Sequence, residues 1–301
     1  MHRRLRTLGV ALLRGLLPAL VAALVLGLLA VSAPAQAARA VRVAEPGRAM
    51  WVWDRPDVDE LVAFATAHGV DDLFVSVPDG LATSSTLDWY RSLRPATQAA
   101  GIRVQALGSE TTWIDRPKAA LAWQSSALST GLFDGVHLDV EPWIHPGWDG
   151  SRKAVATAWL GLLDSLARAT RLPVEADLAF WLDQVTVQGT RLDRAAIARV
   201  DAVTVLTYRH VATGPDSITG LGATALAAAA KARKPARLAV ETNDLGDDAV
   251  ARKQTFFGRT AAELAQVLGE VDDVEAAAGA GASTYRGIAV HDHLGWAALA
   301  D

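Results

Sequence analysis

The chain has 301 residues, a formal net charge of −4 at pH 7 and no cysteine. Because the net charge is slightly negative and the basic residues gather only near the N-terminus, nucleic acid and anionic membrane surfaces are excluded as expected partners. The lack of cysteine excludes disulfides and thiol chemistry, so the stability of the folded chain must come from core packing.

The N-terminal segment has the order of a secretory signal peptide. Basic residues precede an uncharged apolar stretch at Gly15–Val31, and the small-residue motif Ala35–Ala37 follows it. We expect residues 1–37 to be removed on export, which leaves residues 38–301 as a secreted monomer with no stable membrane partner. An uncleaved membrane anchor is the alternative, because the apolar stretch is just long enough to span a bilayer.

The rest of the chain, residues 38–301, predicts an α/β fold: a single (β/α)8 barrel, also called a TIM barrel. Short β-rich runs alternate eight times with Ala/Leu-rich runs of helical periodicity, which is typical of a parallel sheet wrapped by helices. The length of this part also matches one such barrel. The eight expected strands are Ala49–Asp54, Asp72–Val77, Arg103–Gly108, Gly135–Glu141, Val174–Ala179, Ala202–Tyr208, Arg237–Glu241 and Gly287–His291.

Amphipathic segments with apolar residues at three- and four-residue spacing separate these strands. Gly69, Gly101 and Gly131 follow three of the segments, where a left-handed C-terminal cap requires glycine. Neither a GxGxxG motif nor a P-loop is present, which favours the closed barrel over a nucleotide-binding open sheet, and we expect no cofactor. The expected helices are Val58–His68, Leu87–Ala100, Lys118–Leu128, Arg152–Ala169, Arg194–Val200, Ala223–Ala232 and Ala261–Val271.

The fourth expected strand, Gly135–Glu141, carries the residues with the clearest chemistry. Side chains alternate along a strand, so His137, Asp139 and Glu141 share one face and the intervening apolar residues share the other. Active sites of these barrels lie where the strands end at the carboxyl face. Three ionisable groups inside a barrel are costly unless they are paired or lie near water, so we interpret them as a binding or catalytic site. A buried polar network that fixes the barrel interior is the alternative.

The run Asp134-Gly135-x-x-x-Asp139-x-Glu141 resembles the fourth strand of the family 18 glycoside hydrolases, the chitinase and endo-β-N-acetylglucosaminidase group. That family carries Asp-Gly-x-Asp-x-Asp-x-Glu, and His137 stands where its middle Asp would be. The resemblance implies that Glu141 is the general acid that protonates the glycosidic oxygen. It also implies that Asp139 orients and stabilises a substrate N-acetyl group that acts as the internal nucleophile.

A second resemblance is to the large retaining-glycosidase clan, in which an Asn-Glu-Pro motif on strand four supplies the acid/base and a strand-seven glutamate is the nucleophile. Glu141-Pro142 and Glu241 match this pattern, while Val140 stands where the Asn would be. The resemblance implies a covalent glycosyl-enzyme, which requires two carboxyl groups about 5 Å apart. Glu241 could instead be a structural partner of Arg209 or of another residue at the barrel mouth, and the sequence leaves these alternatives open.

Further polar and aromatic residues fall near the expected strand ends. Tyr208 ends the sixth strand and resembles an active-site tyrosine of family 18. The pair His291-x-His293 raises the possibility of a metal site with Asp139 and His137, but the companion motifs of metal-dependent barrel hydrolases are missing, so we expect no metal. Flat aromatic rings suit the C–H faces of sugars. The expected substrate-binding residues are Tyr208, Asp177, His291, Trp143, Trp53, His137 and Trp181.

Taken together, these residues predict a secreted glycoside hydrolase that cleaves an extracellular or cell-wall polysaccharide. The expected catalytic residues are Glu141, as general acid/base with a pKa raised by burial, together with Asp139 and Glu241. A non-catalytic carbohydrate- or cell-wall-binding barrel is the main alternative, because His137 and Val140 depart from the two family patterns. A hydrolase that acts on amide or ester bonds of the cell envelope is a further alternative.

Overall fold

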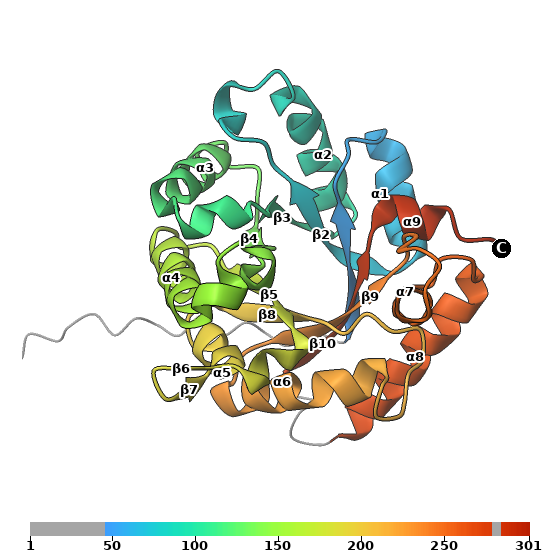
Figure 1. The fold of residues 1–301 in the computed structure, drawn as a ribbon. Helices are drawn as coiled ribbons and strands as arrows, with labels where there is room; N and C mark the ends of the chain where they lie inside the picture. Colours follow the sequence, from blue (N-terminus) through green and yellow to red (C-terminus); the bar gives the residue numbers. More distant parts are fainter. Residues whose placement is uncertain (1–45, 279–283) are drawn as a thin grey trace, which may run out of the picture. The chain divides into compact units, whose positions relative to one another are not determined.

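A computed structural model describes residues 46–278 and 284–301. Eight parallel strands close into a barrel in the order β1-β10-β9-β8-β5-β4-β3-β2, with helices around the outside (Figure 1). The (β/α)8 barrel predicted from the sequence is therefore confirmed. The predicted signal peptide, residues 1–37, lies outside the described residues.

Each of the eight predicted strands corresponds to one strand of the barrel. The fourth ends at Leu138 rather than Glu141, although the backbone N–H of Asp139 still donates to the Gly108 carbonyl at 2.9 Å. The side-chain alternation therefore continues to Asp139. The barrel strands are β1 Gly47–Val52, β2 Val70–Ser76, β3 Arg103–Gly108, β4 Gly135–Leu138, β5 Val174–Ala179, β8 Ala202–Leu206, β9 Ala236–Glu241 and β10 Tyr285–His291.

The predicted helices are all present, with ends that differ from the predictions by up to six residues. Gly69, Gly101 and Gly131 follow three of these helices and adopt φ of 65°, 73° and 71°, respectively, as the cap prediction requires. No helix within residues 46–278 and 284–301 has the length and apolar character needed to cross a bilayer. The helices are α1 Val58–Ala67, α2 Leu87–Ala99, α3 Pro117–Ser129, α4 Trp148–Arg168, α5 Leu192–Ile197, α6 Ile218–Ala232 and α8 Ala261–Ala277.

Several short elements were not predicted from the sequence, and most lie in loops that follow the barrel strands. They are too short for hydrophobic periodicity to reveal them. The C-terminal helix α9 is only five residues long, in line with the few residues that follow the last strand. These elements are α7 Ala249–Gln254, α9 His293–Ala297, the hairpin strands β6 Thr186–Val187 and β7 Thr190–Arg191, and the 3-10 helices η1 Leu81–Thr83, η2 Thr111–Ile114, η3 Pro142–Ile144 and η4 Phe180–Gln184.

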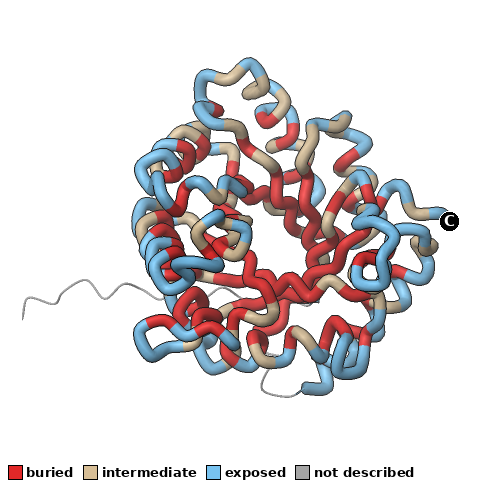
Figure 2. The backbone as a smooth tube through the Cα atoms, viewed as in Figure 1, coloured by how far each residue is buried: buried red, intermediate tan, exposed pale blue. Residues whose placement is uncertain are grey.

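Two apolar layers form the core. The larger one lies between the strands and the surrounding helices, so burial concentrates on the ring of strands and on the inner sides of the helices (Figure 2). The smaller one groups inward-facing side chains such as Trp51, Phe74 and Leu107, with Trp53, Trp143 and Tyr208 packed against it. The polar residues of the barrel interior therefore lie next to an apolar inner layer.

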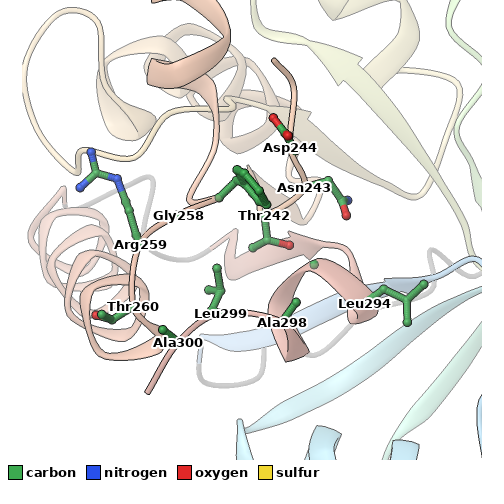
Figure 3. A pocket seen from close by; sticks show the side chains of 12 residues that line it. Thr242, Asn243, Asp244, Gly258, Arg259, Thr260, Leu294, Ala298, Leu299 and Ala300 are labelled. Atoms are coloured by element: carbon green, nitrogen blue, oxygen red, sulfur yellow. The ribbon is translucent and has the colours of Figure 1, made fainter. Parts of the chain in front are cut away.

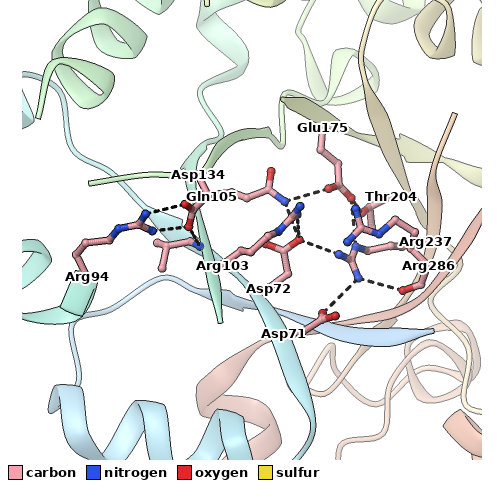
Figure 4. A network of polar contacts seen from close by, with 11 residues as sticks. Asp71, Asp72, Arg94, Arg103, Gln105, Asp134, Glu175, Thr204, Arg237 and Arg286 are labelled. Atoms are coloured by element: carbon pink, nitrogen blue, oxygen red, sulfur yellow. Dashed lines mark hydrogen bonds and ion pairs between the residues drawn. The ribbon is translucent and has the colours of Figure 1, made fainter. Parts of the chain in front are cut away.

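A buried ion network fills the barrel beyond this layer (Figure 4). Arg237 Nη2 lies 2.7 Å from Asp72 Oδ2, and Gln105 Nε2 donates to Asp72 at 3.0 Å and to Glu175 at 3.1 Å. Thr204 donates to Glu175 at 2.6 Å. Burial alone would raise the pKa of Glu175, but the charge of Arg237 and the hydrogen bond from Thr204 help to lower it to about 2. Glu175 is thus held ionised as part of the structural network.

Candidate active site at the barrel mouth

The closed barrel brings the predicted ionisable site residues together. The Tyr208 phenol, just after β8, lies among four carboxyl groups contributed by β5, β9 and the segment after β4. Burial is the main cause of the raised pKa of Tyr208, and the negative charges of Glu241, Asp139, Asp177 and Glu141 raise it further. Tyr208 therefore stays protonated at neutral pH and can donate a hydrogen bond to a ligand.

Asp139 and Glu141 follow β4 at the mouth and are half-buried. Burial raises the pKa of Asp139 to about 7, and the negative charge of Asp177 adds to this shift. Burial also raises the pKa of Glu141 to about 7, helped by the charge of Asp139 and opposed by hydrogen bonding from the Trp143 indole. Two neighbouring carboxyl groups can therefore each bind a proton near neutral pH, as acid/base chemistry requires.

His137 and Asp177 form a fully buried pair just below Asp139. His137 Nε2 lies 3.0 Å from Asp177 Oδ2, and the His137 ring stacks on Phe74 at a centroid distance of 3.6 Å. Burial lowers the pKa of His137 to about 4, so the ring is neutral at pH 7. We assign its proton to Nε2, because Nδ1 has no partner and a buried N–H is costlier to leave unpaired than a lone pair.

Glu241 and His291, at the ends of the neighbouring strands β9 and β10, form a hydrogen-bonded chain with Trp53, just after β1. Glu241 Oε2 lies 2.8 Å from His291 Nδ1, and the Trp53 indole N–H donates to His291 Nε2 at 2.8 Å. An indole N–H can only donate, so Nε2 accepts and Nδ1 carries the proton that it donates to Glu241. Burial alone would lower the pKa of His291, but the hydrogen bond and charge of Glu241 raise it.

The other oxygen of Glu241 is held by residues that sequence reasoning missed. The backbone N–H groups of Thr242 and Asn243 each donate to Oε1 at 2.8 Å, and the Asn243 side-chain amide donates at 3.0 Å. With His291 on Oε2, the carboxylate accepts four hydrogen bonds. The Thr-Asn pair after the seventh strand carries no sequence signal for this contact. The predicted alternative partner, Arg209, instead pairs with Asp216 at 2.7 Å.

The tryptophans near the strand ends divide into two groups. Trp51, Trp113 and Trp296 are buried in the core and cannot offer a ring face to a ligand. Trp53, Trp143 and Trp181 remain partly exposed, and the rings of Trp143 and Trp181 meet edge to face at a centroid distance of 5.7 Å. The three tryptophans named from the sequence as substrate-binding residues each retain accessible surface.

The two histidines of the His291-x-His293 motif do not face a shared site. His291 binds Glu241 and Trp53, whereas His293 packs edge to face on Phe64 at a centroid distance of 5.3 Å. Within the described part of the chain, no group of three or more His, Asp or Glu side chains is arranged to hold a metal ion. The two histidines of this motif therefore have separate surroundings.

A cavity of about 500 Å³ lies beside the mouth, between the segment after β9, the loop after α7 and the C-terminal residues (Figure 3). It shares Thr242 and Asn243 with the hydrogen bonds that hold Glu241, so it adjoins the Glu241–His291 pair. Asp139 and Glu141 are not part of its wall. The lining residues are Thr242, Asn243, Asp244, Phe257, Gly258, Arg259, Thr260, Leu294, Gly295, Ala298, Leu299 and Ala300.

No protein-family model and no curated protein matches this sequence. Among solved structures, a GH18 chitinase from Pseudoalteromonas aurantia is similar with a TM-score of 0.54 and 12% identity, over 83% of this chain and 97% of that one. A class V chitinase from Pseudomonas fluorescens Pf-5 is similar with a TM-score of 0.51 and 13% identity, over 84% and 98%. The chain therefore has a TIM barrel that resembles the family 18 fold.

Proposed function

We propose that this protein is a glycoside hydrolase that cleaves an extracellular or cell-wall polysaccharide, with Glu141 as the general acid. The observation that carries the proposal is the placement of Glu141 beside Asp139 at the carboxyl mouth of the barrel, each with a pKa raised to about 7. A carboxyl group with such a pKa keeps a proton to donate to a leaving oxygen at neutral pH. The likeness in fold to two chitinases supports the reaction class.

The surroundings of Glu241 favour substrate assistance over a glutamate nucleophile. Its carboxylate accepts four hydrogen bonds, from Thr242, from His291 and twice from Asn243. A carboxylate engaged in this way is a weaker nucleophile, because attack on a sugar carbon would disrupt these bonds. In this proposal Glu241 positions His291, while Asp139 orients an N-acetyl group of the substrate that attacks in its place.

The remaining mouth residues would position the sugar. Tyr208 stays protonated and can donate to a substrate oxygen. The partly exposed rings of Trp53, Trp143 and Trp181 offer apolar faces that suit sugar C–H groups. We propose that these residues form the walls of the substrate site, next to the acid on Glu141.

Export is part of the proposal and rests on the order of residues near the N-terminus. A basic start, an apolar stretch at Gly15–Val31 and the small-residue motif Ala35–Ala37 are typical of a signal peptide. Sequencing the N-terminus of the protein recovered from culture medium tests this point. A start near residue 38 supports cleavage, whereas recovery of the intact chain in the membrane fraction supports an anchor.

The test of the activity is a glycan-hydrolysis screen with the wild-type protein, Glu141→Gln, Glu241→Gln and the exposed control Glu60→Gln. We expect Glu141→Gln to lower kcat/KM by about 10²- to 10⁴-fold, because it removes the transferable proton. We expect a smaller loss from Glu241→Gln and none from Glu60→Gln. Equal losses at Glu141 and Glu241 would instead favour the two-glutamate mechanism.

A carbohydrate-binding barrel without activity is the second candidate, because His137 occupies a position where family 18 carries a carboxylate. It predicts saturable binding of a glycan with no product from any glycan in the screen. Isothermal titration with the same oligosaccharides separates the two functions. If Glu141→Gln turns over a glycan as fast as the wild-type protein, Glu141 is not the general acid and the protein is a different kind of hydrolase.

A further inference from the structure

The register of the barrel brings two carboxyl groups together across β4 and β5. His137 pairs with Glu175 in this register, so the positions two residues further along, Asp139 and Asp177, lie level at the mouth. The negative charge of Asp177 raises the pKa of Asp139, so the two side chains are close enough to affect each other's protonation. Two neighbouring carboxyl groups can form a hydrogen bond to each other only when one of them carries a proton.

No cation compensates this pair. Among the described residues, no Lys or Arg forms an ion pair with either carboxyl group, and Arg237 is engaged with Asp72 and Glu175 instead. Asp177 is fully buried. Two adjoining carboxylates in such a site cannot both ionise near neutral pH, because their mutual repulsion adds to the cost of burial.

His137 fixes one end of this arrangement. Its Nε2–H donates to Asp177 Oδ2 at 3.0 Å, and stacking on Phe74 holds the ring in place. Asp177 Oδ1 is buried and has no hydrogen-bond partner among the described residues. Oδ1 is therefore the oxygen of Asp177 that is left to share a proton with Asp139.

We propose that Asp139 and Asp177 form a carboxyl pair that holds a single proton, oriented by His137, and that this pair sets the charge felt by Glu141. The proton can reside on either carboxyl group. When it is on Asp177, the negative charge of Asp139 faces Glu141 and favours the protonated form of the acid. When it is on Asp139, that charge is removed. Asp177 is thus a positioning residue that acts through Asp139.

Other titratable groups face the pair and must be considered in any titration. They lie on β4, β5 and β10 and in the segments after β4 and β8. His137 is neutral, so it acts on the pair as a hydrogen-bond donor and not through a positive charge. The groups that face Asp139 or Asp177 are His137, Glu141, Glu175, Tyr208 and His291.

The effect of the pair on Glu141 as an acid rests on the proposed function, but the pairing itself does not. The test therefore measures protonation directly, by NMR of the intact protein labelled with ¹³C at the aspartate side-chain carboxyl carbons, from pH 3 to 9. The Asp139→Asn and Asp177→Asn variants assign the two signals. Asp149→Asn, which removes a carboxylate that is 98% exposed on α4, is the matched control.

In the wild-type protein we expect Asp139 to titrate near pH 7 and to show two steps that coincide with those of Asp177. In Asp177→Asn the midpoint of Asp139 should fall by about one pH unit or more, because the neighbouring negative charge is removed. Asp149→Asn should leave it unchanged. A midpoint of Asp139 that does not move in Asp177→Asn would overturn the proposal.

If Asp177→Asn does not fold, the wild-type curves still decide the question. Independent single-step titrations of Asp139 and Asp177 would refute the pairing, whereas coincident two-step curves support it. Because NMR needs no turnover, an inactive protein with coupled curves would refute only the hydrolase function. An active protein with uncoupled curves would refute only the pair.

Discussion

The Trp53 indole N–H donates to His291 Nε2 at 2.8 Å and thereby keeps a lone pair on that nitrogen. Replacing Trp53 with Phe removes the donor and frees Nε2 to bind a proton that Glu241 already favours through Nδ1. We expect the pKa of His291, already raised, to rise by about a further half unit or more, since a hydrogen bond is worth about 0.5 to 1.5 kcal/mol.

Proton NMR of the histidine ring signals against pH measures this shift. The control is Trp123→Phe, which removes an indole donor bonded to the Val77 carbonyl at 2.9 Å. That variant should leave the His291 midpoint unchanged. A lower midpoint in Trp53→Phe would mean that the indole does not hold the neutral tautomer.

The ion network inside the barrel predicts a large loss of stability when its most buried arginine is removed. Arg237→Met deletes the ion pairs with Asp72 and Glu175 and leaves Arg103 as the remaining arginine paired with Asp72, and such changes typically cost about 3 to 5 kcal/mol. Arg91→Met removes an exposed pair with Asp88 and should cost less than about 1 kcal/mol. Urea unfolding compares the two variants, and similar costs would refute a stabilising role for the network.

Replacing two helical glycines with alanine should have opposite effects on the stability of the protein. A Cβ at Gly222 in α6 would lie 2.3 Å from Leu238 Cδ2, so Gly222→Ala should cost about 1 to 3 kcal/mol through overpacking. A Cβ at Gly161 in α4 meets no atom within 4 Å, so Gly161→Ala should add about 0.5 to 1 kcal/mol by improving helix propensity. Thermal unfolding of both variants checks the pair, and a destabilised Gly161→Ala would contradict the second expectation.

The shifted carboxyl groups predict how stability depends on pH. The pKa of Glu175 is lowered from 4.5 to about 2, so the stability that it contributes is present above pH 4.5 and is lost as pH falls toward 2. The pKa of Glu141 is raised from 4.5 to about 7, so the folded state binds more protons than the unfolded chain between these values. Stability from this group is therefore lost as pH rises from 4.5 to 7.

Urea unfolding at a series of pH values separates these two effects. Glu141→Gln should gain stability relative to wild type between pH 4.5 and 7, with a constant difference above that range, because its neutral amide has no charge to bury. In Glu175→Gln, the free energy of unfolding should decrease less than in wild type as pH falls from 4.5 to 2. A Glu141→Gln difference that does not vary with pH would show that Glu141 has an ordinary pKa in the folded protein.

The pKa of Glu141 also predicts the pH dependence of the proposed reaction. Since the acid must be protonated, kcat/KM should fall as pH rises through about 7. Asp177→Asn leaves Asp139 ionised at neutral pH, so this alkaline limb should move to higher pH. A limb that stays in place would show that Asp177 does not act on Glu141 through Asp139.

The sequence by itself determined the barrel and the side of the fourth strand that carries the chemistry. Hydrophobic periodicity distinguishes strands from helices, and eight alternations within residues 38–301 fit one closed barrel. A strand period of two residues is a local property, so His137, Asp139 and Glu141 could be placed on one face from the sequence alone. Whether each tryptophan side chain is buried or partly exposed, by contrast, depends on neighbours far away in the chain.

Only the tertiary structure decided which groups share protons and hydrogen bonds. Asp139 and Asp177 meet because β4 and β5 pair in one register, and Glu241 is held by His291 because β9 and β10 are neighbours in the closed barrel. Periodicity says which way a side chain faces, but not which partner stands opposite it. The protonation of these carboxyl groups depends on burial and on the charges of those partners, and both arise only when the barrel closes.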